Sequence, residues 1–508
     1  MDLSNPKYSM TIDELKSLLT EDIDGNLIPL TKTINSDNET PVSIYSKLAS
    51  EPYSFLFESV EGAERIARYS FIGVKAYEII KTGVGQSHGS VDPLDLIQKK
   101  LSERKVVSRF KSHRFDGGAV GYAAYEAASY FEDLPTAAGD TLGLPEAVFM
   151  FFDTYVMFDH IDKRISVVSH VEIDQNIEES YSKAVDSIES VINALSRSDD
   201  LERSLLQTRK NSVINHDGYD KNCPVINFDG LQASVNITKD YYDQSLKKII
   251  DYIYAGDCIQ VVFSQRFSVP TTALPLDIYR SLRQINPSPY MFYLDLDEFQ
   301  IVGASPEMLV RCVDNKIDYH PIAGTRRRGV DSNEDSKMAA ELLEDKKELA
   351  EHIMLVDLGR NDVGRVSVPG SVEVTQLMEV EFYSHVMHIV SHVTGILKPE
   401  LNCYDAFRSC FPAGTVSGAP KIRAMEILSE LEPVKRGPYS GAVGYFSFSG
   451  NMDTCIALRT LVIKDSLAHV QAGGGIVADS NVDDEYEETI NKASAVMKAI
   501  KVAESNTK

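Results

Sequence analysis

Apolar positions in the first part of the chain come in short runs, and they predict strands rather than helices. Up to about residue 170 these runs are separated by turns that contain glycine, a pattern typical of β-structure. The expected strands include 54–59, 69–73 and 148–152. A helical period follows over about 174–196, where apolar residues recur every three or four positions.

Beyond about residue 235 the pattern opens with a helix that begins at 237–240, and a long helix is expected over 338–358. A further helix follows over 422–431, and the last helix begins at 483. The strands expected in this region are 260–267, 385–394, 441–449, 455–463 and 468–471. Because the strands come in runs, the pattern predicts an α+β fold with large, mainly antiparallel sheets flanked by helices, not a doubly wound fold.

A polar stretch over 197–233 lacks any clear period and is interpreted as a linker. The chain of 508 residues is too long for one ordinary core. We therefore expect two lobes, an N-terminal lobe over 1–196 and a second lobe over 234–508.

The composition narrows the class of partner. A formal net charge of −24 argues against nucleic acid and against an anionic membrane surface. A small anion could still bind, but only through a local cluster of cations, a metal ion or helix N-termini. The chain has no apolar run long enough to span a membrane and no secretory signal. Its six scattered cysteines fit a cytoplasmic location.

Two helices carry acidic pairs with matching spacing. Glu348 and Glu351 lie three residues apart on one face of the expected helix, and Glu485 and Glu488 repeat this spacing in the last helix. Either pair alone could be a solvated surface or a complement to the helix dipole. Together, the two pairs could also converge on one Mg²⁺ ion, which prefers oxygen ligands.

Two glycine-rich loops are candidates for holding an anion. The segment 411–421 precedes an expected helix, so backbone amides near Thr415 and Gly418 could face a ligand. The Gly473–Gly475 loop would let the backbone approach a ligand closely. The spacing of a nucleotide-binding P-loop is absent. Tight turns without a ligand remain the alternative for each loop.

The motifs from residue 260 onward resemble those of the chorismate-utilising enzymes, which include anthranilate, aminodeoxychorismate, isochorismate and salicylate synthases. Several long motifs occur in the family's order over roughly 235–500, which makes the resemblance specific. The matching segments are 260–266 (QVVFSQR), 304–307 (ASPE), 321–325 (PIAGT), 351–365 (EHIMLVDLGRNDVGR), 412–421 (PAGTVSGAPK), 437–444 (GPYSGAVG), 472–477 (AGGGIV) and 485–493 (EYEETINKA).

The resemblance implies a magnesium site and a substrate pocket. Glu351 and Glu488 match the family's magnesium ligands, and Glu348 and Glu485 support them. The ion would neutralise the ring carboxylate of chorismate. Positions that match the substrate pocket are Gly324, Thr325, Tyr439, Arg459, Gly473, Gly474, Gly475 and Lys492. Of these, Tyr439, Arg459 and the three glycines match groups that hold the enolpyruvyl carboxylate.

The resemblance also implies catalytic roles. Glu307 matches the general acid that protonates the departing 4-hydroxyl group, and a buried site could keep it protonated. His388 matches the residue associated with the later loss of pyruvate, and Thr415 is expected beside these catalytic groups. Gln260 stands where the water-adding enzymes have a lysine that activates water. Glutamine cannot act as a base, which favours ammonia as the nucleophile.

The resemblance therefore favours anthranilate synthase component I, a lyase that converts chorismate and ammonia to anthranilate and pyruvate at the first step of tryptophan biosynthesis. Aminodeoxychorismate synthases often carry a nucleophilic lysine where this chain has Ala323, but they remain the alternative. A catalytically inactive amino-acid sensor is the other alternative, and the presence of the expected catalytic residues argues against it.

A thinner resemblance points to feedback inhibition by L-tryptophan. Residues 55–59 (FLFES) resemble the family's LLES element, and 286–292 (NPSPYMF) match its partner segment. The implied inhibitor-binding residues are Glu58, Ser59, Pro289, Tyr290 and Met291. Because the chain shows no amidotransferase nucleophile loop, we expect ammonia to come from a separate glutamine amidotransferase subunit, component II.

Overall fold

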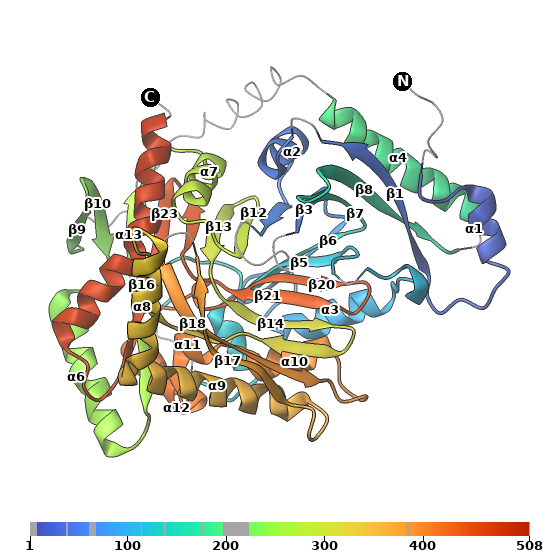
Figure 1. The fold of residues 1–508 in the computed structure, drawn as a ribbon. Helices are drawn as coiled ribbons and strands as arrows, with labels where there is room; N and C mark the ends of the chain where they lie inside the picture. The colour runs from blue at the N-terminus through green and yellow to red at the C-terminus, as the bar shows by residue number, and fades with distance from the viewer. Residues whose placement is uncertain are drawn as a thin grey trace.

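The computed structural model describes residues 8–36, 39–59, 68–112, 114–135, 139–174, 176–196, 223–383 and 386–506. Two large sheets of antiparallel strand pairs run through it, with helices on their outer faces (Figure 1). Within the described residues, no helix is long and apolar enough to cross a membrane. The predicted α+β fold with mainly antiparallel sheets is confirmed.

The larger sheet contains strands from both ends of the chain. Its order is β1 (Leu27–Asn35), β8 (Arg164–Glu172), β7 (Thr154–Asp159), β3 (Tyr69–Val74), β2 (Ser54–Glu58), β12 (Tyr290–Asp295), β13 (Phe299–Ser305), β22 (Thr460–Lys464), β23 (Leu467–Ile476), β11 (Gln260–Pro270), β10 (Leu231–Val235) and β9 (Val225–Phe228), and β19 (Gly418–Ala419) pairs with β11.

The smaller sheet is also shared between the two regions. Its order is β16 (Ile322–Arg327), β18 (Val386–Ile396), β15 (Lys316–Tyr319), β14 (Met308–Val313), β21 (Met452–Ile456), β20 (Ala442–Ser447), β5 (Gly118–Ala123), β6 (Ala147–Phe152) and β4 (Glu78–Thr82), and β17 (Glu373–Phe382) pairs with β18. Both sheets therefore cross the boundary expected between the two lobes, and the division at 197–233 stays a proposal.

The hydrophobic core forms one layer between the two sheets and further layers between each sheet and the helices on its outer face. An aromatic layer between the sheets joins Phe55 and Phe292 of the larger sheet to Tyr122 and Tyr445 of the smaller one. The outer face of the larger sheet is covered by α1 (Ile12–Leu18), α2 (Pro41–Leu48), α4 (Ile177–Leu195), α7 (Pro275–Ile285) and α13 (Val482–Asn506). The outer face of the smaller sheet is covered by α3 (Pro93–Ser102), α9 (Lys346–Val366) and α10 (Cys403–Cys410).

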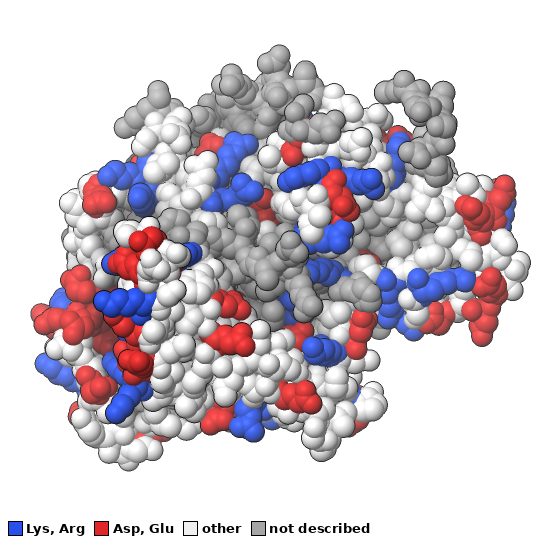
Figure 2. Space-filling view, in the orientation of Figure 1, with Lys and Arg blue, Asp and Glu red and all other residues white. Residues whose placement is uncertain are grey.

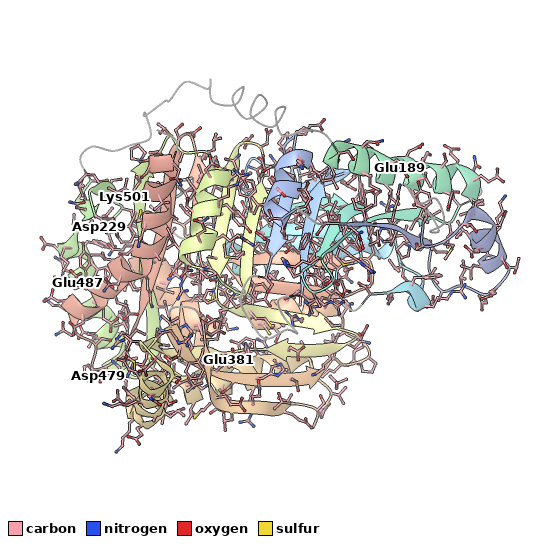
Figure 3. The ribbon with its side chains drawn as sticks, turned by 45° about the horizontal axis from the view of Figure 1, so that its top comes forward. Glu189, Asp229, Glu381, Asp479, Glu487 and Lys501 are labelled. Atoms are coloured by element: carbon pink, nitrogen blue, oxygen red, sulfur yellow. The ribbon has the colours of Figure 1, made fainter. Side chains whose placement is uncertain are left out.

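Two helices cover the β11 end of the larger sheet, α6 (Lys239–Ala255) and α12 (Lys421–Leu431). The short helix α11 (Gly414–Ser417) precedes α12. At the far end of α13, Lys501 donates to the backbone carbonyl of Asp229 in the turn between β9 and β10, and Figure 3 shows the two residues close together. The sheet edge is thus tied to the last helix.

Two local predictions were wrong, and the segment expected as a linker contains strands at its end. The helix expected over 338–358 is two helices, α8 (Ser332–Glu344) and α9, because Asp345 caps α9 by accepting from the backbone N–H groups of Lys347 and Glu348. The strand expected over 455–463 is β21 and β22, which belong to different sheets. The end of the expected linker forms β9 and most of β10, joined by the turn at Asp229 and Gly230, while 197–222 lies outside the described residues.

Candidate active site

The carboxylates of α9 and α13 approach one short stretch of β23. Gln260 Nε2 donates to Glu351 Oε1 at 3.0 Å. A Cβ atom added to Gly475 would lie 2.5 Å from Gln260 Nε2, and one added to Gly474 would lie 2.9 Å from Glu485 Oε2. A side chain at either position would have to displace the polar end of Gln260 or Glu485, so the two glycines leave room for these groups beside β23.

Lys492 of α13 links the acidic pair to the glycine stretch. Its ammonium group pairs with Glu488 Oε1 at 2.6 Å and donates to the carbonyl of Gly473 at 3.1 Å. Burial raises the pKa of Glu485, whose Oε2 is buried without a hydrogen-bond partner in the described part of the chain. The α13 pair therefore includes one carboxylate oxygen that is free to take a ligand.

The α9 pair is held differently. Glu348 Oε1 accepts from Arg326 at 3.0 Å, and the same guanidinium pairs with Asp345 at 2.8 Å. The positive charge of Lys347, beside Glu348 on α9, acts on Glu485 of α13. Among the described residues, no three acidic, histidine or cysteine side chains are arranged as a ready metal site.

Glu307 is a buried acid close to this region. Burial raises the pKa of its carboxyl to about 8, although the hydroxyl of Thr415 and the charge of Lys492 oppose the shift. The hydroxyl of Thr415 makes no hydrogen bond of ordinary geometry within the described residues. At neutral pH the Glu307 carboxyl is therefore protonated and can donate a proton.

His388 is buried on β18 beside β16. Its Nδ1 lies 2.9 Å from the carbonyl of Gly324 and 3.1 Å from the hydroxyl of Thr325. Because a carbonyl can only accept, Nδ1 carries the proton and Nε2 keeps its lone pair. Burial lowers the pKa of His388 to about 4, which keeps the ring neutral at physiological pH. This histidine can accept a proton at Nε2.

Arg459 lies where the chain passes from β21 of the smaller sheet to β22 of the larger one, and Tyr439 lies just before β20. Ser440 N donates to the carbonyl of Ala457 at 3.2 Å, which brings the segments of Tyr439 and Arg459 side by side. Both side chains are held in buried surroundings, which raise the pKa of Tyr439 and lower that of Arg459. The hydroxyl of Tyr439 would lie 3.0 Å from a Cβ atom added to Gly473. The phenol of Tyr439 thus lies beside the glycine backbone, and the chain segment of Arg459 runs next to that of Tyr439.

A separate cavity lies between the two sheets where β2 pairs with β12. The register places Glu58 opposite Met291, so the two segments expected to form the inhibitor site are neighbours. Ser59, Pro289, Tyr290, Met291 and Arg114 are among the residues that line the cavity. The buried hydroxyl of Ser59 has no hydrogen-bond partner in the described residues.

Glu58 borders the same cavity, but its carboxylate is engaged elsewhere. Glu58 Oε2 accepts from the hydroxyl of Tyr279 and pairs with Arg283 at 3.2 Å, both on α7. Polar groups inside the cavity include the carboxylate of Asp453, which accepts from Tyr290 at 3.0 Å and pairs with Arg311 at 2.8 Å. The cavity is therefore apolar for the most part, with a few fixed polar groups.

Comparison with known proteins shows which family the chain belongs to. The profile of the chorismate binding enzymes matches residues 52–498. The chain belongs to this family. Anthranilate synthase component 1 of Acetivibrio thermocellus is 45% identical over 97% of this chain and 98% of that protein. The Pseudomonas aeruginosa anthranilate synthase component 1 is 45% identical over 95% of this chain and 97% of that protein.

Solved structures agree with this assignment. The crystal structure of anthranilate synthase component I from Streptococcus pneumoniae has a TM-score of 0.72 and 37% identity, and the match covers 91% of this chain and 98% of that one. The menaquinone-specific isochorismate synthase MenF from Escherichia coli has a TM-score of 0.68 at 17% identity, covering 96% and 98%, and shows the shared fold alone. Within the chorismate binding enzymes, this chain is an anthranilate synthase component I.

Two residues that contact the candidate site were not predicted from the sequence. Arg326, which pairs with Glu348, directly follows Thr325 in the chain, so the basic run 326–328 was the available signal. Asn286 lies 3.5 Å from Arg459 and belongs to the segment expected to bind an inhibitor. Neither contact can be inferred from spacing, because each joins segments that are distant in sequence.

Proposed function

We propose that this enzyme forms anthranilate and pyruvate from chorismate and ammonia at the first step of tryptophan biosynthesis, in the cytoplasm. Ammonia would come from a separate glutamine amidotransferase subunit, component II, and L-tryptophan would inhibit the reaction. The observation that carries the proposal is the buried Glu307 carboxyl, whose pKa of about 8 suits a proton donor at neutral pH. The charge of Lys492 acts on the pKa of this carboxyl, and the charge of Arg459 acts on the pKa of His388, which supports grouping these side chains in one site.

The residues of α9 and α13 fit a magnesium ion. Glu351 and Glu488 would hold it, with Glu348 and Glu485 beside them. Carboxylate oxygens are the ligands this ion prefers, and the buried Glu485 Oε2 lacks a partner among the described residues. When bound, the ion would neutralise the ring carboxylate of chorismate. Lys492 would keep Glu488 in place through their ion pair of 2.6 Å.

The first chemical step would use Glu307 and Gln260. Neutral ammonia forms a bond to C2 of the ring, the double bonds shift, and the C4–O bond breaks. Glu307 gives its proton to the departing 4-hydroxyl, which leaves as water. Gln260 would lie at the approach of the nucleophile, where its amide could contact ammonia but could not remove a proton from water. Tyr439, Arg459 and the Gly473–Gly475 backbone would hold the enolpyruvyl carboxylate, with Lys492, Gly324 and Thr325 lining the pocket.

The second step aromatises the ring. The proton on C2 leaves, the bond to the enolpyruvyl oxygen breaks, and the enolpyruvyl group takes up a proton and departs as pyruvate. His388 suits the removal of the C2 proton, because its Nδ1 is held by Gly324 and its Nε2 can accept. Neutrality of the ring, from a pKa of about 4, keeps that acceptor available.

The direct test is incubation of the purified chain with chorismate, Mg²⁺ and ammonium. We expect anthranilate fluorescence to grow, with equimolar pyruvate measured by a coupled dehydrogenase. The chain contains no tryptophan, so protein fluorescence will interfere little. A non-fluorescent amino product formed without pyruvate would instead assign the chain to aminodeoxychorismate synthesis.

The reaction should depend on pH through Glu307. The donor must be protonated, and its pKa of about 8 means that the protonated form is lost as pH rises through that value. We expect kcat at saturating chorismate to fall about tenfold per pH unit above this pKa. The variant Thr415→Val removes a group that lowers the pKa of Glu307, so the fall of kcat should begin at a higher pH in this variant. If the fall begins at the same pH as in the parent, Thr415 does not influence the pKa of Glu307.

Tryptophan inhibition should weaken when the Ser59 hydroxyl is removed. A hydrogen bond to the inhibitor contributes about 1–1.5 kcal/mol, so we expect Ser59→Ala to raise the half-inhibiting tryptophan concentration by about tenfold, with kcat unchanged. Ser36→Ala is the matched control, because Ser36 is another buried serine whose hydroxyl has no partner in the described residues. Equal inhibition of both variants and the parent would exclude Ser59 from the inhibitor site.

A further inference from the structure

Arg436 is fully buried and uses every N–H group of its side chain. Its Nε donates to Glu432 Oε2 at 2.7 Å, and its Nη2 donates to Glu432 Oε1 at 2.7 Å and to the carbonyl of Val262 at 2.6 Å. Its Nη1 donates to the carbonyl of Val416 at 2.7 Å and to the hydroxyl of Ser440 at 3.3 Å. Five donors are thus matched by acceptors from four residues.

Three of the four acceptor residues belong to separate segments of the candidate active site. Val262 lies on β11 two residues after Gln260 and pairs with Gly475 of β23. Val416 directly follows Thr415 in α11. Ser440 directly follows Tyr439, and the guanidinium of Arg436 lies 5.7 Å from the centre of the Tyr439 ring. One side chain therefore holds β11, which pairs with the glycine-containing strand β23, together with the Thr415 segment and the Tyr439 segment.

Glu432 extends this connection along β11. Its Oε1 accepts from both the backbone N–H and the hydroxyl of Ser264, at 2.9 and 2.7 Å. Ser264 pairs with Gly473 in the register between β11 and β23. The ion pair of Arg436 and Glu432 thus contacts the strand opposite both ends of the Gly473–Gly475 stretch.

Stability alone is a poor explanation for this arrangement. The cost of removing both charges from water largely offsets their attraction, so a buried ion pair often adds little to the free energy of folding. What the pair does supply is fixed geometry, because each carbonyl that it binds can occupy only a narrow range of positions.

We propose that Arg436, held by Glu432, is a positioning residue for the reaction. Through β11 it fixes the position of the three glycines of β23, and through Ser440 the position of Tyr439; these groups would hold the enolpyruvyl carboxylate. Through Val416 it fixes the neighbouring Thr415, which lies beside Glu307. The inference rests on the proposed function. Neither residue touches the reacting atoms. Lysine would not be equivalent here, because the three donors of an ammonium group cannot make the five hydrogen bonds of the guanidinium.

The test compares Arg436→Lys with the parent enzyme in the anthranilate assay with ammonium and Mg²⁺. Because small misplacements of reacting groups reduce rates by up to about 100-fold, we expect kcat to fall at least about tenfold and the KM for chorismate to rise about fivefold. The far-UV circular dichroism of the variant should match the parent. Arg408→Lys is the matched control, because Arg408 pairs with Asp92 at 2.8 Å away from the site; its kcat and KM should stay within about twofold.

A milder variant keeps the test valid if Arg436→Lys does not fold. Ser264→Ala removes one donor to Glu432 and leaves both charges, so the KM for chorismate should rise about threefold. Parent-like kcat and KM in folded Arg436→Lys, or in Ser264→Ala if the lysine variant is unfolded, would overturn the inference. An equal loss in Arg408→Lys would also overturn it. If the parent enzyme makes no anthranilate, the proposed function fails instead.

Discussion

Glu307→Gln is expected to lower kcat by about 10²–10⁴-fold, the usual contribution of a positioned general acid. Glutamine has nearly the same shape but no proton to give to the departing 4-hydroxyl. The fold should be unaffected, because the parent carboxyl is buried in its neutral form and a neutral amide replaces it without adding charge.

Two measurements separate a chemical effect of Glu307→Gln from a structural one. Isothermal titration with L-tryptophan should give the parent affinity, since the cavity at Ser59 and Tyr290 does not include Glu307. The KM for chorismate should change less than about threefold, because the acid acts mainly in the transition state. Parent-like turnover in the variant would remove Glu307 from the mechanism.

The second large effect is expected for the magnesium site. Glu351→Gln replaces a charged ligand with a neutral amide, so the affinity for Mg²⁺ should fall at least about 100-fold, and turnover at low Mg²⁺ should be lost. Gln260 donates to this carboxylate at 3.0 Å, and that hydrogen bond can persist with the amide oxygen of the variant. The fold of α9 should therefore remain.

Metal affinity should be measured directly, by calorimetric titration of Mg²⁺ into the protein, as well as through activity. Glu344→Gln is the matched control, because Glu344 is an exposed acid at the end of α8. This substitution removes the same charge from α8, the helix before α9, so the Mg²⁺ affinity of the variant should stay within about twofold of the parent. Equal binding by Glu351→Gln and the parent would show that the ion is held elsewhere.

The charged surface fits the small-molecule role. On the face shown in Figure 2, the described Lys and Arg side chains are interspersed with Asp and Glu, and they form no broad basic surface there. With a net charge of −24, binding of a dianion must depend on local groups such as Lys492 and Arg459. In the proposed mechanism, a metal ion held by the acidic side chains of α9 and α13 would supply positive charge for this binding.

Local sequence patterns predicted the regular elements well where one period covered one element. The helix at 177–195 and the strand beginning at Gln260 were both expected, because their apolar positions repeat without interruption. The same method missed the break at Asp345. Both α8 and α9 continue a helical period, so the break depends on a capping side chain that Arg326 also contacts.

The change of sheet near Arg459 could not be predicted from the pattern either. Apolar residues continue from β21 into β22, yet the backbone bends there and Arg459 adopts a φ of 48°. A positive φ is uncommon for arginine, and here it occurs where the chain leaves one sheet for the other. This bend places the guanidinium of Arg459 within 3.5 Å of Asn286.

The amino-acid sequence alone determined the fold class, the family and the identity of the acidic, glycine and histidine residues, because these depend on local period and on motifs in a fixed order. Tertiary structure alone decided their chemistry. Burial raises the pKa of Glu307 and lowers that of His388, and sheet pairing brings Ser59 beside Tyr290 in one cavity. Desolvation and contacts between distant segments depend on the surroundings in three dimensions, and no spacing along the chain contains them.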